Sequence, residues 1–143
     1  MPDGLCLEPR DDRTLPSLGL GLTNLVARPT PGSGDLRASE MARGARRLRA
    51  LVGRLQPGIV ALVGVTVYRR LFPGQSGVVR LGLMKRALAG RPLFVLPNPS
   101  GRNARVTPGG MLRAFRALAR MRRAGAGLAS TGAASPRRPP LRG

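Results

Sequence analysis

The residues with the clearest chemical potential lie in segment 98–103, which reads Asn-Pro-Ser-Gly-Arg-Asn and follows the apolar run 93–97 directly. A continuous apolar run predicts a buried central strand, and ligand sites in open α/β sheets form where such strands end. The segment therefore predicts a functional loop that contains no acid. Asn, Pro, Ser and Gly also form ordinary turns, and the local sequence alone favours that simpler interpretation.

The charge of the chain is strongly positive and unevenly distributed. The formal net charge is +19, from 25 basic and 6 acidic residues, and the first 40 residues hold all six acids but only four of the bases. The remaining residues therefore carry 21 positive charges and no side-chain carboxylate. Such a field favours a polyanion, most simply nucleic acid. Biased codon usage is the alternative explanation, since all but one of the bases are Arg.

Several classes of site are excluded by residues that the chain lacks. It contains no His and a single cysteine, Cys6, so we expect no intramolecular disulfide and no bound metal. The absence of His, and of carboxylates after Glu40, argues against hydrolases that use His or paired carboxylates. Neither GxxxxGK[ST] nor a strand-following GxGxxG occurs, so we expect no nucleotide and no other cofactor.

No segment of the sequence predicts export or membrane insertion. The N-terminus is acidic and lacks the sustained apolar stretch of a secretory signal. No apolar run approaches the roughly 20 residues that span a bilayer. We therefore expect a cytoplasmic, nucleoid-associated protein that is monomeric and binds no membrane.

The elements that must position the loop follow from the apolar pattern. Apolar runs predict strands at residues 18–26, 59–63 and 93–97, and three- to four-residue apolar spacing predicts a helix over about 36–55, with Asp35 as its N-cap. Short helical pieces are expected at 65–72 and around 83–88, and Thr107-Pro108 predicts the start of a final helix. This alternation predicts an α/β fold with a mainly parallel sheet.

The final helix has two stripes of different chemistry. The apolar stripe comprises Leu112, Phe115, Leu118 and Ala119, and the basic stripe comprises Arg113, Arg116, Arg120 and Arg123. The apolar stripe predicts the packed face. The basic stripe is available to phosphate, and an ordinary solvated face is an equally good interpretation of it.

Two distant segments resemble those of a known enzyme family. The stretch GLTNLVARPTPGSGDL at residues 21–36 and the loop NPSG at 98–101 resemble the mismatch-specific uracil- and thymine-DNA glycosylases, of the uracil-DNA glycosylase superfamily. A predicted helix ending in Gln56-Pro57, a predicted strand ending in Gly64, and Tyr68 in the following helix fit the same pattern. The resemblance covers about residues 15–123.

The resemblance implies base-excision repair, in which a uracil, or a thymine mispaired with guanine, is flipped out of double-stranded DNA and its N-glycosidic bond is hydrolysed. It implies that Asn24 contacts the flipped pyrimidine and that Arg102 is the wedge that fills the gap left by the base. Many relatives carry Leu there, but a guanidinium can stack in the gap and donate to the widowed guanine. The loop that enters the minor groove comprises Asn98, Pro99, Ser100, Gly101, Arg102, Asn103 and Arg105.

The first motif of this family is not found in the sequence. Relatives carry a GINPG-like motif after an initial strand, and its Asn positions the attacking water, whereas residues 1–20 contain nothing similar. The resemblance thus implies a three-layer sandwich that lacks its first central strand, in a protein truncated at the N-terminus. We expect a disordered, unrelated leader over 1–17, a partial glycosylase-like domain over 18–123 and a disordered basic tail over 124–143.

Three functions stay open at this point. The first is a G·U or G·T mismatch-specific DNA glycosylase, whose uracil can leave as an anion stabilised by hydrogen-bond donors without a strong general acid. The second is a catalytically inactive protein that binds DNA non-specifically through its basic surface. The third is a basic protein associated with RNA or the ribosome. The order of the glycosylase-like segments favours the first two, with mismatched double-stranded DNA as the expected partner.

Overall fold

The structure is a computed structural model that describes residues 8–29, 36–99 and 106–130. A 3₁₀ helix, η1 (Pro9–Leu18), is followed by α1 (Ala38–Leu55), β1 (Val60–Val63), α2 (Val65–Leu71), β2 (Gly82–Leu88), β3 (Arg91–Leu96) and α3 (Pro108–Ser130). None of the helices within the described ranges is long and apolar enough to cross a membrane.

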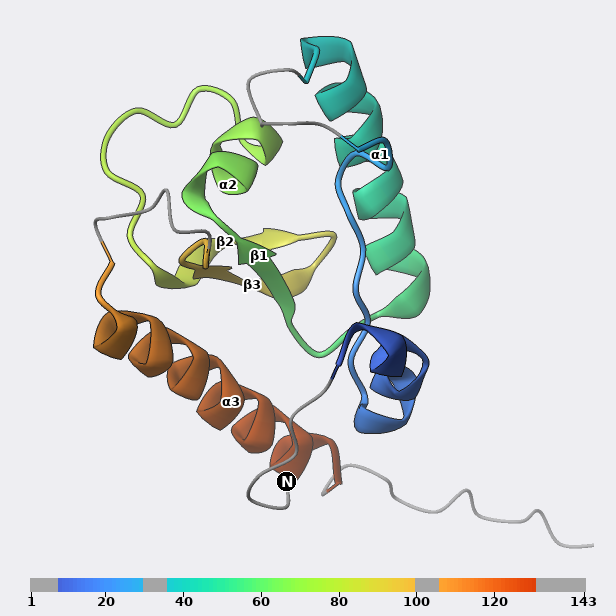
Figure 1. The fold of residues 1–143 in the computed structure, drawn as a ribbon, viewed down its shortest axis with the longest axis vertical. Helices are drawn as coiled ribbons and strands as arrows, with labels where there is room; N and C mark the ends of the chain where they lie inside the picture. The colour runs from blue at the N-terminus through green and yellow to red at the C-terminus, as the bar shows by residue number, and fades with distance from the viewer. Residues whose placement is uncertain (1–7, 30–35, 100–105, 131–143) are drawn as a thin grey trace, which may run out of the picture.

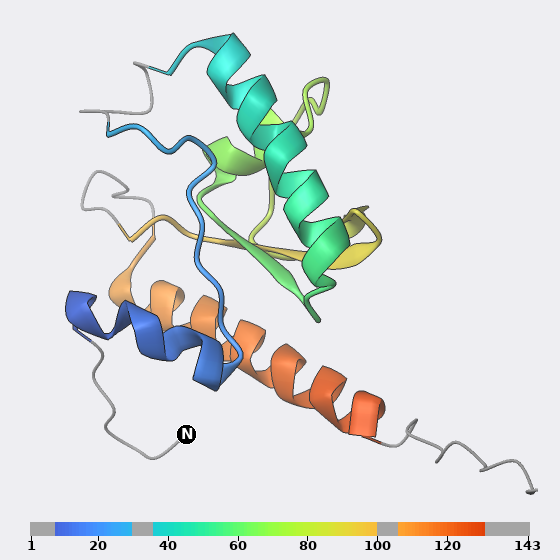
Figure 2. The ribbon, with the colours of Figure 1, turned by 90° about the vertical axis from the view of Figure 1, so that its right-hand side faces the viewer.

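The strands form one mixed sheet in the order β1-β3-β2. β1 is parallel to β3, with Val60 opposite Leu93, and β2 is antiparallel to β3. The antiparallel pair is a tight hairpin because Ala89 and Gly90 both have positive φ, the conformation of a two-residue turn that matches strand twist. α1 and α2 lie on one side of the sheet and α3 lies on the other, so the expected three-layer α/β class is confirmed (Figures 1 and 2).

The core forms around β3, which is buried on both faces. Leu93 and Val95 point to the α1 and α2 side, where they join the main apolar cluster. Phe94 and Leu96 alternate with them and are also buried, as the two-residue period of a strand requires. The other members of the main cluster are Ala45, Leu48, Val52, Val60, Leu62, Tyr68, Leu71 and Leu88. This burial explains why the sequence shows a continuous apolar run before the loop.

Five elements match the sequence predictions in place and type. These are the helix over 36–55, the strands at 59–63 and 93–97, the short helix at 65–72 and the final helix beginning at Pro108. Asp35 lies outside the described residues, and α1 is capped instead by Arg37, whose N–H donates to the Glu40 carboxylate at 2.8 Å.

Two predicted elements are wrong. The helical piece expected around 83–88 is strand β2, because the Ala89-Gly90 turn folds this segment back to pair with β3. The strand expected at 18–26 does not form, because η1 extends to Leu18 and segment 19–29 is held beside α1 by Arg47 and Gly44 without regular secondary structure. Among the described residues, β1 therefore has a neighbouring strand on one side only.

Both ends of the described chain contain helical structure where the composition predicts disorder. Residues 9–17, part of the leader expected to be disordered, lie in η1, whose start is capped by an N–H donation from Glu8 to the Asp11 carboxylate at 2.8 Å. α3 continues to Ser130, so the first residues of the tail predicted to be disordered are helical. The high helix propensity of alanine in this stretch offsets the low propensity of Gly125 and Gly127. Residues 131–143 lie outside the described part of the chain.

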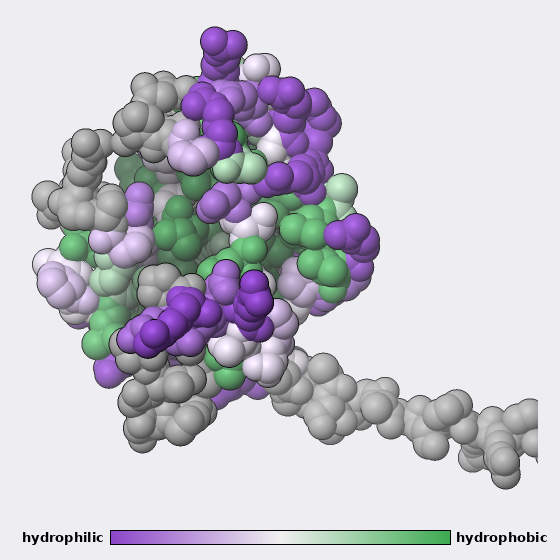
Figure 3. All heavy atoms as spheres, turned by 45° about the vertical axis from the view of Figure 1, so that its right-hand side comes forward, coloured by the Kyte–Doolittle hydropathy of each residue, from purple (hydrophilic) through white to green (hydrophobic). Residues whose placement is uncertain are grey.

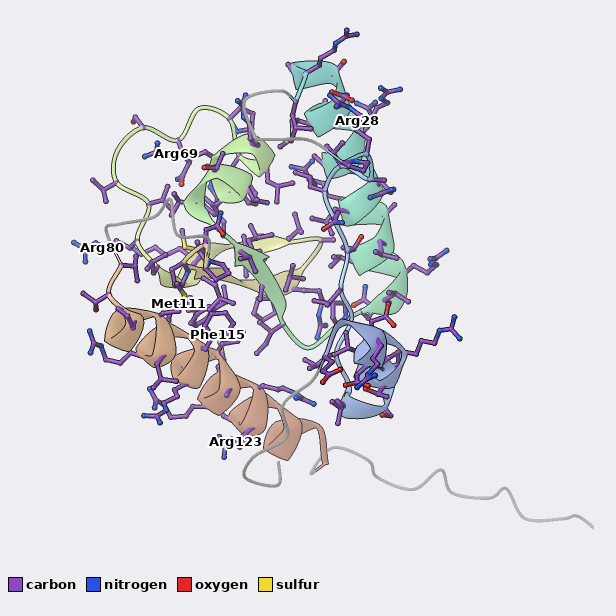
Figure 4. All side chains as sticks on the ribbon, viewed as in Figure 1. Arg28, Arg69, Arg80, Met111, Phe115 and Arg123 are labelled. Atoms are coloured by element: carbon purple, nitrogen blue, oxygen red, sulfur yellow. The ribbon has the colours of Figure 1, made fainter. Side chains whose placement is uncertain are left out.

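The apolar stripe predicted for the final helix is partly wrong. Leu112 and Phe115 are 50% and 42% exposed and Ala119 is exposed, whereas Met111, Ala114 and Leu118 are partly buried. The helix is rotated relative to the prediction, because Met111 and Ala114 complete a more continuous apolar face with Leu118. Figure 4 shows Met111 and Phe115 pointing from α3 toward the sheet.

Candidate nucleic-acid site

The carboxyl ends of β1 and β3 meet at one edge of the sheet because these strands are parallel. Gly64 follows β1 directly, and its N–H donates to the Leu96 carbonyl at 2.8 Å. A Cβ atom added to Gly64 would lie 3.5 Å from Asn98 Cβ. Gly64 has φ +98°, which side-chain-bearing residues rarely adopt. Glycine therefore brings the β1–α2 turn against the base of the predicted loop.

The described base of that loop passes from a buried residue to exposed ones. Pro97 is fully buried, whereas Asn98 and Pro99 are exposed. Asn98 therefore lies at the surface directly after a buried strand end, a position suited to a ligand-contacting residue. The predicted loop residues Ser100, Gly101, Arg102, Asn103 and Arg105 lie outside the described residues, so the wedge role of Arg102 stays a prediction.

Asn24 is positioned by a different element. Segment 19–29 runs beside α1 in Figures 1 and 2. Arg47 Nη2 donates to the main-chain oxygen of Asn24 at 2.6 Å, and the residue itself is exposed. The main chain is thus held while the side-chain amide stays accessible, which is the arrangement that a base-contacting residue needs.

Gly44 allows this segment to approach α1 closely. A Cβ atom on Gly44 would lie 2.1 Å from the Leu25 carbonyl oxygen, a distance that no side chain could occupy. Leu25 packs against the main apolar cluster, so the approach also contributes to the core. Sequence reasoning missed both Gly44 and Arg47, because an interior glycine and an arginine in a basic helix give no local sign of a tertiary role.

An ion pair fastens the end of the segment to the start of α1. Arg28 donates to both oxygens of Glu40, at 2.6 and 3.0 Å. This pairing, together with the N–H of Arg37, lowers the pKa of Glu40 from 4.5 to about 2. Arg28, Arg37 and Arg43 surround a shallow depression of about 380 Å³, in which one carboxylate faces three cations. The depression therefore keeps a positive potential.

Tyr68, which fits the family pattern, has a packing role in this structure. It is 1% exposed, its hydroxyl donates to Gln75 Oε1 at 2.9 Å, and its ring centroid lies 5.0 Å from that of Phe72. These contacts tie α2 to the loop that follows it. Tyr68 is therefore a buried packing residue of α2 and not an exposed contact.

The fold and the site together define an α/β protein. Its candidate site lies at the carboxyl ends of β1 and β3, contains polar residues but no acid, and belongs to a surface suited to anions. Comparison with known families makes the class specific: the model of the Uracil DNA glycosylase superfamily matches residues 4–120. The chain therefore belongs to this superfamily, its class of function is DNA repair by a DNA glycosylase, and its partner is DNA. The matched range begins within the segment that sequence analysis separated as a leader.

Proposed function

We propose that this chain recognises G·U or G·T mismatches in double-stranded DNA, in the manner of the mismatch-specific glycosylases. The observation that carries the proposal is the position of Asn98, exposed at the carboxyl end of β3 and directly against Gly64 of the β1–α2 turn. The NPSG sequence begins at this point, and NLVARPTPGS is anchored to α1 through Arg47 and Gly44. The described parts of both segments, residues 24–29 and 98–99, thus contact the same sandwich.

Each proposed contact uses a group whose chemistry suits it. Asn24 has a side-chain amide that can both donate to and accept from the edge of a flipped pyrimidine. The loop 98–103 with Arg105 enters the minor groove, and Arg102 fills the space left by the flipped base. The protein acts as a monomer on nucleoid DNA in the cytoplasm, without metal or other cofactor.

Base release requires a group that positions water, and we propose that this group, the Asn of a GINPG-like motif, is missing from this chain. Two carboxylates of the described residues are already engaged within the fold. Glu40 is bound by Arg28, and the Asp11 carboxylate caps η1. We therefore expect the chain as it stands to bind a mismatch but to release little base.

A uracil-release assay tests this proposal. The chain is compared with a variant that carries an added N-terminal strand and a GINPG-like motif, using a duplex with one labelled G·U pair. The expected result is uracil release by the extended variant and little or none by the chain alone. If the extended variant folds and binds the duplex but leaves it uncut, the glycosylase assignment is wrong.

The alternative function is a catalytically inactive protein that binds DNA non-specifically. The four arginines of the α3 stripe favour it, because they make no hydrogen bond or ion pair within the described residues. It predicts equal affinity for matched and mismatched duplexes and binding that weakens steeply with salt.

A further inference from the structure

α3 presents an arginine face, defined here as Arg113, Arg116, Arg120 and Arg123. Their spacing of three, four and three residues places them within about 80° of one another around a helix of 3.6 residues per turn. All four side chains are exposed. No hydrogen bond or ion pair of the described residues involves them, so their charges are uncompensated.

The packing of α3 fixes the direction of this face. Met111 and Phe115 point toward the sheet, and Arg123 points away from it (Figure 4). The guanidinium of Arg122 donates to the Leu18 carbonyl and so joins α3 to η1. An apolar contact on one side and a tether to η1 hold the helix against rotation. The arginine face is therefore preorganised toward solvent.

The shape and length of the face suit a linear polyanion. Arg116, Arg120 and Arg123 line one shallow depression of about 490 Å³. From Arg113 to Arg123 the helix rises about 15 Å. Double-stranded DNA carries roughly four phosphates per strand over that length of its axis. A small anion would use one or two of these arginines, whereas a phosphate backbone can use the whole row.

We propose that the arginine face is a backbone-binding surface for double-stranded DNA, separate from the loop after β3. The choice of DNA as ligand rests on the proposed function. α3 begins at Pro108, ten residues after Asn98, and the proposal places the face and the loop on the same duplex. The face holds the flanking phosphates and adds affinity without reading sequence or mismatch.

Two triple variants with the same change in charge test the surface. R116Q/R120Q/R123Q removes most of the arginine face, and R46Q/R54Q/R70Q removes three arginines of α1 and α2 that are also exposed and unpaired within the described residues. Binding of a labelled 25-base-pair duplex is measured by fluorescence anisotropy between about 50 and 200 mM KCl. Thermal unfolding of both variants verifies that they are folded.

The expected result is a selective loss in the α3 variant. For this variant, the slope of log affinity against log salt concentration becomes shallower by about 2.7. Its affinity at 50 mM KCl falls at least about tenfold. The slope of the control changes by less than about 1. Equal changes in the two variants would overturn the proposal, because they would show a response to total charge. Tighter binding of the wild-type chain to double-stranded RNA would overturn the choice of DNA.

The same titrations separate this surface from the proposed function. Each protein is also measured on a duplex with one G·U pair. If the wild type does not prefer G·U over G·C, the mismatch assignment fails, while a selective change of slope still supports the arginine face. If the α3 variant keeps the wild-type preference but loses affinity for both duplexes, the face and the loop have the separate roles proposed here.

Discussion

Two glycines of α1 have opposite surroundings, and this difference gives a matched pair of variants. A Cβ atom at Gly44 would meet the Leu25 carbonyl at 2.1 Å, whereas one at Gly53 would meet nothing within 4 Å. Gly44→Ala is expected to lower the free energy of unfolding by about 1–3 kcal/mol through overpacking. Gly53→Ala is expected to raise it by about 0.5–1 kcal/mol through helix propensity. Urea denaturation measures both, and equal stabilisation would show that segment 19–29 does not cross α1 here.

Glu40 gives the chain a pH-dependent anchor. The pKa of Glu40 is lowered from 4.5 to about 2, mainly by the hydrogen bond from Arg28 and then by the N–H of Arg37. The ionised carboxylate therefore stabilises the folded chain above pH 4.5. This contribution is lost as the pH falls toward 2. The wild type should therefore be more stable than Glu40→Gln at pH 6, and the difference should shrink on acidification. If the unfolding temperatures of the wild type and Glu40→Gln change in parallel with pH, the ion pair does not contribute to stability.

At the scale of elements, the β1–α2 turn supports the base of the loop. Gly64 is at φ +98° and packs beside Asn98, so Gly64→Ala strains the turn and is expected to cost about 1–2 kcal/mol of stability. It should also reduce the preference for G·U over G·C, which Gly53→Ala should leave unchanged. Urea denaturation and anisotropy titration check the two effects. An unchanged preference in a destabilised Gly64→Ala protein would remove this turn from the site.

The elements that could be predicted from sequence are those whose signal is local. α1 has apolar residues on one face, and β3 is a continuous apolar run because both of its faces are buried. β2 has weak alternation, and its pairing depends on the Ala89-Gly90 turn. Segment 19–29 has the apolar residues of a strand, yet its position is set by Gly44 and Arg47 on α1. Such tertiary contacts leave no periodic signal in the sequence.

The same distinction applies to the site. Asn98 was predictable because it follows a buried strand, and Asn24 was predictable through the family resemblance. The groups that hold them, Gly64 beside Asn98 and Arg47 beneath Asn24, come from other segments of the chain. Sequence therefore indicates candidate ligand-contacting residues more readily than the residues that support them.

At the scale of the whole molecule, charge and apolar surface are distributed for contact with a large partner. Figure 3 shows hydrophobic side chains among hydrophilic ones on the face that it presents, and Leu22 and Leu55 are 82% and 64% exposed. The four arginines of the α3 face are uncompensated within the described residues. Electrostatic attraction to DNA should therefore provide much of the affinity, and the two anchored segments should provide the discrimination.

The affinity ratio between two duplexes that differ only in one G·U or G·C pair tests the central claim most directly. Anisotropy competition at 150 mM KCl suppresses much of the non-specific term, so the contacts to the flipped base decide the ratio. If the chain recognises the mismatch, it should bind the G·U duplex at least about tenfold more tightly than the G·C duplex. This ratio corresponds to a discriminating contact worth about 1.4 kcal/mol. Equal affinities would contradict mismatch recognition and leave a protein that binds DNA through charge alone.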